Sequence, residues 1–151
     1  MGPILLFIGI IATTGVFYPL AVTGISWLVF PDQANGSLVK KDGQIVGSEL
    51  IAQEFKDPKY FWARPSASNY NAIPSEARHL SPLDPEFPKN VRDTMSASGL
   101  DPHIPLEMAY EQIPRIAKAR ALKPEQIRDL VDKAEKPYIN VLMMNLELDR
   151  I

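Results

Sequence analysis

The chain divides near residue 31 into an uncharged apolar stretch and a mixed polar remainder. Residues 3–30 contain no charged side chain, and every Asp, Glu, Lys and Arg lies at or after Asp32. As a helix this run would be about 42 Å long, more than the about 30 Å of a bilayer's hydrocarbon core. A cleaved signal peptide usually has a basic start and an apolar core of about 7–15 residues, and here no Lys or Arg precedes the run. We therefore predict a retained transmembrane helix at residues 3–30.

One side of this helix carries small residues and a proline. Gly15, Pro19 and Thr23 are spaced four apart and so share a helix face. Pro19 has no N–H for the carbonyl of Gly15, which in lipid needs another partner. Small residues also let a second helix approach closely. We predict that this face packs against a partner helix; the alternative is a helix kinked in lipid, with water or Thr hydroxyls compensating.

The remainder of the chain alternates between strand and helix patterns. Residues 37–46 predict two short strands around an Asp42–Gly43 turn, and residues 138–146, after Pro137, predict another strand. Between them, apolar periodicity predicts helices at 84–98, at 106–121 and from Pro124 onward. The order of strands, helices and strand predicts an α+β domain at residues 31–151, with a small sheet and about three helices.

Composition excludes several function classes. The chain has 151 residues, a net charge of −2 and a pI of about 5.7, so no basic excess indicates a nucleic-acid partner. It has no cysteine, which excludes disulfides, thiolate zinc sites and thiol nucleophiles. The two histidines, His79 and His103, lack metal-ligand spacing to a second ligand, and no P-loop motif is present.

Ser98, Asp101 and His103 lie within six positions, in the stretch SGLDPHIP, and have the composition of a hydrolase triad. A nucleophilic serine needs a base within reach and an oxyanion hole, and no G-x-S-x-G elbow occurs here. In the structural interpretation, Ser98 and Gly99 end a helix, Asp101 accepts backbone N–H bonds near the next helix, and His103 ties down the loop. We favour this structural signature loop; the alternative is a membrane-anchored hydrolase using Ser98 and His103.

Two further polar groups have ordinary structural explanations. Glu147 and Asp149, near the end of the chain, are expected to be solvated. Residues 60–62 are aromatic and precede Arg64. They could stack or bind an anion, but a core edge with an arginine reaching out to solvent is the commoner arrangement. The Pro/Ser/Asn-rich segment that follows, with Ser68, is expected to be an exposed loop.

Six stretches of the sequence together resemble the KdpC family, the C subunit of the high-affinity potassium-transporting ATPase. In the family's order they are GVFYPLAVTGISWLVFPDQANGSLV (15–39), GSELIAQEF (47–55), YFWARPSA (60–67), SGLDPHIP (98–105), QIPRIAKAR (112–120) and INVLMMNLELD (139–149). The sequence departs from the family pattern in lacking its Ser-Gly-Gly-Ser-Asn segment after RPSA. It also lacks the basic residues that usually precede the membrane helix, and has Pro105–Leu106 where Ser-Pro is common.

The resemblance implies a non-catalytic accessory subunit in the cell membrane, with a single membrane helix and an extracytoplasmic domain. Its implied partners are a potassium-channel-like membrane subunit and a P-type ATPase subunit, besides the lipid bilayer. It would stabilise the assembly and raise the ATP affinity or coupling of the pump subunit. ATP would then be bound at the level of the complex, with no cofactor held by this chain alone.

The orientation of the domain rests on two opposing arguments. Lys40 and Lys41 follow the predicted membrane helix and no Lys or Arg precedes it, which favours a cytoplasmic domain. That charge bias is small, and long domains are translocated largely regardless of charge. The family resemblance implies that residues 31–151 lie outside, and we expect the extracytoplasmic orientation.

Overall fold

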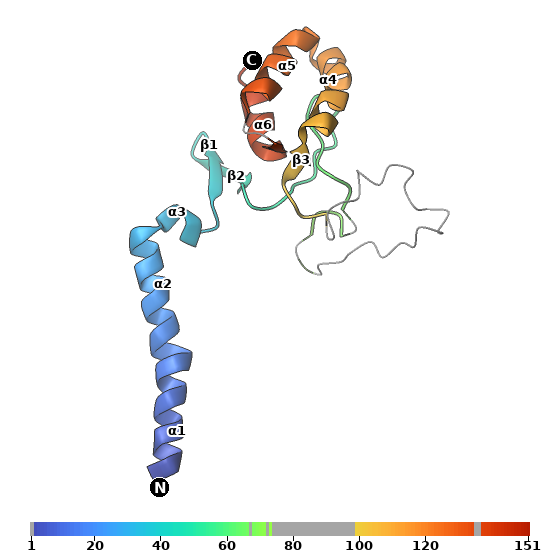
Figure 1. Ribbon diagram of the computed structural model, residues 1–151. Coiled ribbons are helices and arrows are strands. Elements are labelled where there is room, and N and C mark those ends of the chain that lie inside the picture. Colours follow the sequence, from blue (N-terminus) through green and yellow to red (C-terminus); the bar gives the residue numbers. More distant parts are fainter. Residues whose placement is uncertain (1, 67, 72, 74–98, 135–136) are drawn as a thin grey trace, which may run out of the picture. The chain divides into compact units, whose positions relative to one another are not determined.

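The computed structural model describes residues 2–66, 68–71, 73, 99–134 and 137–151 (Figure 1). They form two compact units, Met1–Leu38 and Val39–Ile151, which are described separately. The helix expected at residues 84–98 lies outside the described residues.

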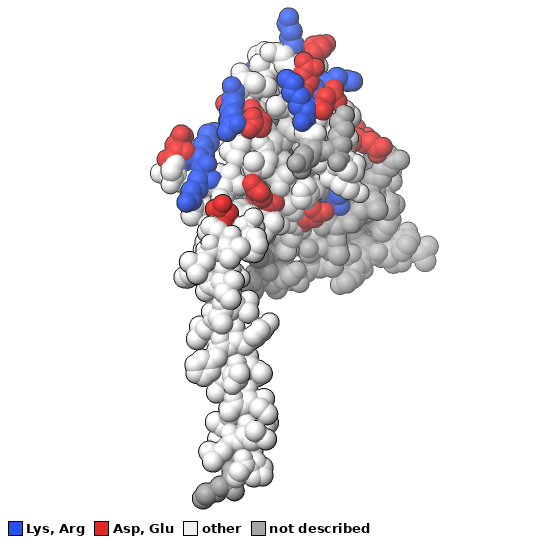
Figure 2. All heavy atoms as spheres, turned by 60° about the vertical axis from the view of Figure 1, so that its left-hand side comes forward, with Lys and Arg blue, Asp and Glu red and all other residues white. Residues whose placement is uncertain are grey.

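The first unit is almost entirely helical. Helix α1 (Gly2–Ala12), the π-helical turn η1 (Thr13–Phe17) and helix α2 (Tyr18–Val29) are consecutive, and the short helix α3 (Pro31–Ala34) follows. Gly2–Val29 forms a 28-residue helical stretch, long and apolar enough to cross a membrane, with no residue buried inside the protein. Figure 2 shows no charged residue along it. The N-terminal apolar helix is therefore confirmed.

The chain next forms a β-hairpin from β1 (Leu38–Lys41) and β2 (Gln44–Ser48). Asp42 and Gly43 connect the strands with φ angles of 53° and 79°. Two positive φ angles are what a two-residue type I′ turn requires, and that turn matches the twist of the strands. The predicted hairpin is confirmed.

A second two-stranded ribbon and three helices build the main body. Strand β3 (His103–Pro105) pairs antiparallel with β4 (Tyr138–Asn140), with Ile104 opposite Ile139. Helices α4 (Leu106–Arg120) and α5 (Pro124–Lys133) lie between these strands in sequence, and α6 (Val141–Leu148) follows β4. The α+β class and the helices expected near 106–121 and from Pro124 are confirmed.

The strand predicted over residues 138–146 is wrong beyond Asn140. The Asn140 side chain accepts a hydrogen bond from the backbone N–H of Met143 at 3.3 Å, which caps a helix start. Val141, Met144 and Leu148 are then buried on one face of α6, at helical spacing. The described part consequently holds two separate two-stranded sheets instead of one small sheet.

The core lies among the helices, the β3–β4 ribbon and an irregular segment. Its largest fully buried side chains come from all of these: Phe61, Ile104, Ile116, Ile127, Val131, Ile139 and Leu148. Each such side chain contributes roughly 1.5–3 kcal/mol when removed from water. Phe61 belongs to no helix or strand, so other groups must satisfy the backbone that carries it into the core.

Candidate functional site

The predicted partner face lies on the apolar helical stretch Gly2–Val29. Gly15 falls within the π-helical turn, and Pro19 and Thr23 lie in α2. The backbone N–H of Tyr18 donates to the carbonyl of Thr13, which widens the helix directly before Pro19. The Thr23 hydroxyl donates to the Pro19 carbonyl at 2.8 Å.

Among the residues that the structure describes, no contact explains a glycine at position 15. A Cβ atom added there would meet nothing within 4 Å. The hydroxyls of Thr13 and Thr14 donate to the carbonyls of Gly9 and Ile10, so neither compensates the carbonyl of Gly15. The space beside Gly15 is open, as it also is at Gly9 and Gly24, so it permits the approach of another helix but does not distinguish this face.

The signature loop is held by backbone contacts to distant segments. Ser98 lies outside the described residues. Gly99 has a φ angle of 63°, and a Cβ added to it would lie 2.4 Å from the Cα of Ser66 and 2.7 Å from the carbonyl oxygen of Pro65. Only glycine fits, because the conformation is left-handed and a backbone passes directly beside it. Just beyond, the Pro102 carbonyl accepts the N–H of Val141 at 2.9 Å.

Asp101 organises the second half of this loop. Its Oδ1 accepts the backbone N–H of His103 at 3.0 Å and lies 3.1 Å from the Nδ1 of the same residue. Its other oxygen lies 3.8 Å from the Nη1 of Arg64. A carboxylate on Nδ1 orients an imidazole, as in hydrolase triads. Here the same oxygen also closes a local turn, which is what the structural interpretation requires.

The aromatic segment lies at the edge of the core, as expected, but Arg64 is placed differently. Phe61 is buried, and Trp62 stacks under the guanidinium of Arg115, whose carbon lies 3.7 Å from the ring centroid. Arg64 is only 6% exposed, so the expectation that it reaches solvent is wrong. Ser68, in the loop expected to be exposed, is buried, and its hydroxyl donates to the carbonyl of Asn71.

Side chains from two helices satisfy the backbone around Phe61. The five consecutive carbonyls of residues 58–62 each accept a hydrogen bond of 2.5 to 3.2 Å from a side chain of α4 or α6. In chain order, the donors are Arg115, Arg120, Arg115, Asn145 and Gln112. The irregular segment thus has its carbonyls satisfied without joining a sheet.

Two side-chain amides, those of Asn145 and Gln112, each bind both the backbone N–H and the backbone carbonyl of a single residue. Asn145 accepts the N–H of Phe61 at 2.7 Å and donates to its carbonyl at 3.0 Å. Gln112 makes the same pair of bonds to Trp62, at 2.8 and 3.2 Å. Asn145 is only 2% exposed, so its bonds are shielded from water, whereas those of Gln112 are exposed.

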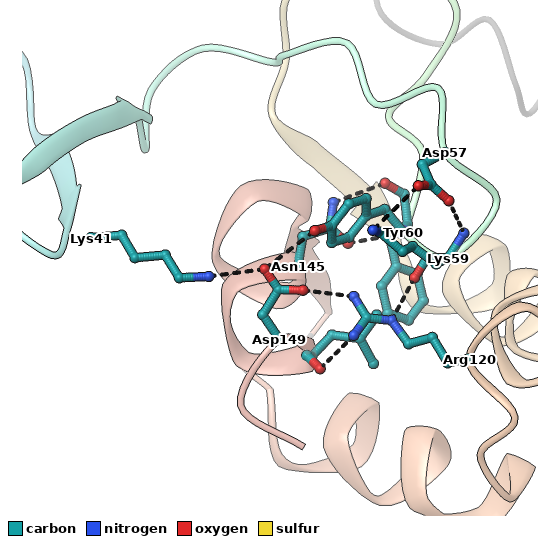
Figure 3. A network of polar contacts seen from close by, with 9 residues as sticks. Lys41, Asp57, Lys59, Tyr60, Arg120, Asn145 and Asp149 are labelled. Atoms are coloured by element: carbon teal, nitrogen blue, oxygen red, sulfur yellow. Dashed lines mark hydrogen bonds and ion pairs between the residues drawn. The ribbon is translucent and has the colours of Figure 1, made fainter.

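Asp149 joins three parts of the second unit (Figure 3). Its Oδ1 accepts from Arg120 of α4 at 2.7 Å, and its Oδ2 accepts from Lys41 of the hairpin at 3.0 Å and from the hydroxyl of Tyr60 at 3.3 Å. Asp149 is exposed, as expected, but it also forms ion pairs with Lys41 and Arg120 that the sequence did not predict. Because the donors come from distant sequence positions, no local pattern reveals this network.

The charge on Asp149 is favoured in the folded state. Partial burial alone would raise the pKa of this carboxyl group, but the hydrogen bond from Arg120 and those from its two other donors outweigh burial and hold the pKa below 3.8. Glu147 instead pairs with its neighbour Arg150. Within the described residues, no three His, Asp or Glu side chains gather as a possible metal site.

Comparison with known proteins identifies the family. The family profile described as "K+-transporting ATPase, c chain" (KdpC) matches residues 2–96 and 93–150. The chain belongs to the KdpC family. The relatives it resembles include the potassium-transporting ATPase KdpC subunits of Dechloromonas aromatica (41% identical, covering 97% of this chain and 94% of the relative) and Pseudomonas entomophila (43%, 91% and 87%). Another is the KdpC subunit of Bradyrhizobium diazoefficiens (39%, 97% and 94%).

The stretches that carry the KdpC resemblance contact one another in the second unit. YFWARPSA is held by Gln112 and Arg115 of QIPRIAKAR, and by Asn145 of INVLMMNLELD. SGLDPHIP meets INVLMMNLELD through the β3–β4 pairing and meets GSELIAQEF through the Ala52 N–H to Leu100 carbonyl bond. These motifs build one interlocked framework, which sequence reasoning did not foresee.

This chain is shorter than some of its KdpC relatives. The alignment to the Dechloromonas protein runs over 179 positions, more than the 151 residues of this chain. That relative therefore has residues for which this chain has no counterpart.

Proposed function

We propose that this chain is the non-catalytic accessory subunit of an ATP-driven, high-affinity potassium uptake complex. The observation that carries the proposal is the match to the KdpC family along nearly the whole chain. The interlocked motifs support an accessory role, because their polar side chains form hydrogen bonds and ion pairs with backbone groups and with one another. The chain would stabilise the complex and raise the ATP affinity or coupling of its pump subunit.

The membrane helix would attach the subunit to its partners, a potassium-channel-like membrane subunit and a P-type ATPase subunit. Gly15, Pro19 and Thr23 are the proposed contact face, supported by their spacing of four residues and by the small side chains of Gly15 and Thr23. Gly15→Leu should reduce the recovery of the partner subunits with a tagged chain, because a bulky side chain keeps two backbones apart. The matched control is Gly9→Leu, six residues earlier and therefore on another side of the helix. Equal losses for both variants would contradict a specific face.

The domain would lie on the extracytoplasmic side, so any effect on cytoplasmic ATP would be transmitted through the complex. A single cysteine introduced at Asp129, on the exposed face of α5, tests this orientation cleanly in a chain without native cysteine. We expect a membrane-impermeant maleimide to label intact cells. Labelling only after lysis would place the domain in the cytoplasm and make direct contact with the ATP-hydrolysing machinery possible.

The accessory role itself is tested on the purified complex. Removing this subunit should raise the KM for ATP of potassium-stimulated ATP hydrolysis, and adding the chain back should restore it. The purified chain alone should not hydrolyse ATP. An unchanged KM in the complex without the chain would contradict a role in ATP affinity.

A hydrolase using Ser98 and His103 is the competing function, because Asp101 contacts the Nδ1 of His103 as a triad aspartate would. Under the proposal, His103→Ala disturbs the loop or the assembly and no chemical step. Turnover of an ester, peptide or phosphate by the pure chain, abolished in folded His103→Ala, would favour the hydrolase.

A further inference from the structure

The β1–β2 hairpin exposes an unusual amount of apolar surface for so short a segment. Ile45 is 60% exposed and Val46 37%, while Leu50 and Ile51, directly after the hairpin, are 61% and 41% exposed. We call these four residues the hairpin patch. Adjacent strand residues point to opposite faces, so Ile45 and Val46 leave apolar side chains open on both faces of the hairpin.

The hairpin also lacks a strand neighbour on either side. In the described part of the chain, β1 and β2 pair only with each other, so each strand has an outer edge whose N–H and C=O groups meet no further strand. An isolated two-stranded hairpin is only marginally stable in water. Polar contacts tie it to the main body, chiefly the Lys41–Asp149 ion pair at 3.0 Å and the bond from Asn140 to the Glu49 carbonyl at 2.8 Å. These contacts fix its position but cover none of the apolar patch.

The hairpin cannot lie far from the membrane. Eight residues, 30–37, lie between Val29, where helix α2 ends, and Leu38, where β1 begins. Even fully extended, the nine steps from Val29 to Leu38 span only about 30 Å, and the helical turn of α3 shortens that reach. The covalent chain therefore keeps the start of the hairpin within about 30 Å of the end of the proposed membrane helix.

The chemistry of the hairpin decides between lipid and protein as its cover. Acyl chains could cover the apolar side chains, but they offer no hydrogen bonds to two open strand edges, and such edges are not tolerated facing hydrocarbon. Asp42 at the tip and Lys40 in β1 add charges that also disfavour insertion. A protein surface can supply apolar contacts and hydrogen-bonding groups together.

We propose that the hairpin patch is a docking surface for a membrane-embedded subunit of the same transporter, which covers it just outside the bilayer. This inference rests on the proposed function, because it takes its partner from the complex. It adds a second attachment point, separate from the Gly15 face of the membrane helix.

The test compares the full chain alone in lipid nanodiscs with the whole complex in the same nanodiscs. Single cysteines replace Ile45 or Leu50, and Asp129→Cys on α5 is the control. We expect maleimide labelling at both patch positions to be at least tenfold slower in the complex than in the chain alone, with the control unchanged. Independently, Ile45→Asp should reduce recovery of the partner subunits, while Trp62 fluorescence shows that the main body remains folded.

The outcomes separate this inference from the proposed function. Equal labelling rates in the two samples, with the partner subunits present, would overturn the docking surface and leave the accessory role intact. Slow labelling already in the chain alone would assign the patch to the bilayer and overturn it as well. Failure of the wild-type chain to recover any transporter subunit would refute the proposed function, and the docking surface with it.

Discussion

Asn145 provides the sharpest test of how the segment around Phe61 is held. Replacing it with alanine removes the acceptor of the Phe61 N–H and the donor to the Phe61 carbonyl, both in a buried site. A buried polar group left without a partner costs about 1–3 kcal/mol. Two such groups should therefore lower the free energy of unfolding by about 2–6 kcal/mol, a large part of the about 5–15 kcal/mol that stabilises a typical domain.

Gln112→Ala is the comparison, because it removes the same two bonds from the adjacent residue, Trp62, together with the acceptor of a 2.7 Å bond from Arg115. Water can replace those exposed bonds, so we expect a loss of about 1 kcal/mol. The measurement is urea unfolding of the full chain in detergent, in a Trp27→Phe background that leaves Trp62 as the sole tryptophan. If Asn145→Ala costs no more than Gln112→Ala, burial does not set the value of these amide bonds, and the reasoning fails.

Three further changes follow from the same structure. Because the pKa of Asp149 is lowered on folding, its network stabilises the fold above about pH 4, and this contribution is lost as the pH falls through the folded-state pKa. The difference in unfolding free energy between wild type and Asp149→Asn should therefore shrink between pH 7 and pH 3. A constant difference would contradict the role of the charge. Ala121 ends α4 at a φ angle of 55°, a left-handed conformation that strains alanine but not glycine. Ala121→Gly should therefore raise the free energy of unfolding by about 0.5–1 kcal/mol, once the greater freedom of glycine in the unfolded chain is subtracted. A loss of stability would show that the residue is not strained. Gly99→Ala places a Cβ 2.4 Å from the Cα of Ser66 and should destabilise the second unit severely, whereas near-wild-type unfolding would show that the loop can move aside.

The sequence was sufficient where a local rule decides the structure. The long uncharged run predicts the N-terminal apolar helix, and the Asp42–Gly43 pair predicts a type I′ turn whichever contacts surround it. Helices α4 and α5 follow from apolar periodicity, because their buried residues recur on one face. In each case the information lies within a few consecutive residues.

The failed strand at residues 138–146 shows where periodicity is ambiguous. A continuous apolar run suits either a buried strand or a buried helix. The deciding features were Asn140, which can cap a helix, and a polar Asn145 four residues after Val141. Taken as a helix, that spacing places Asn145 on the buried face with Val141 and Leu148, where its amide reaches Phe61. A buried amide within an apolar run was the signal that pointed to a polar contact in the core.

The remaining errors share one physical cause. The ion pairs of Asp149 were not foreseen, and Arg64 looked like a surface arginine, because the sequence shows only the neighbours of a residue along the chain. Their partners, Lys41 and Arg120 for Asp149 and Asp101 for Arg64, are supplied by the fold. The same reasoning weighs against chemistry at SGLDPHIP. Its Asp101 pairs with Arg64 of another family motif and its strand pairs with INVLMMNLELD, so the motif can be required for folding without acting on any substrate. A function of this chain should therefore be sought on surfaces that the framework leaves open, the membrane-helix face at Gly15 and the hairpin patch.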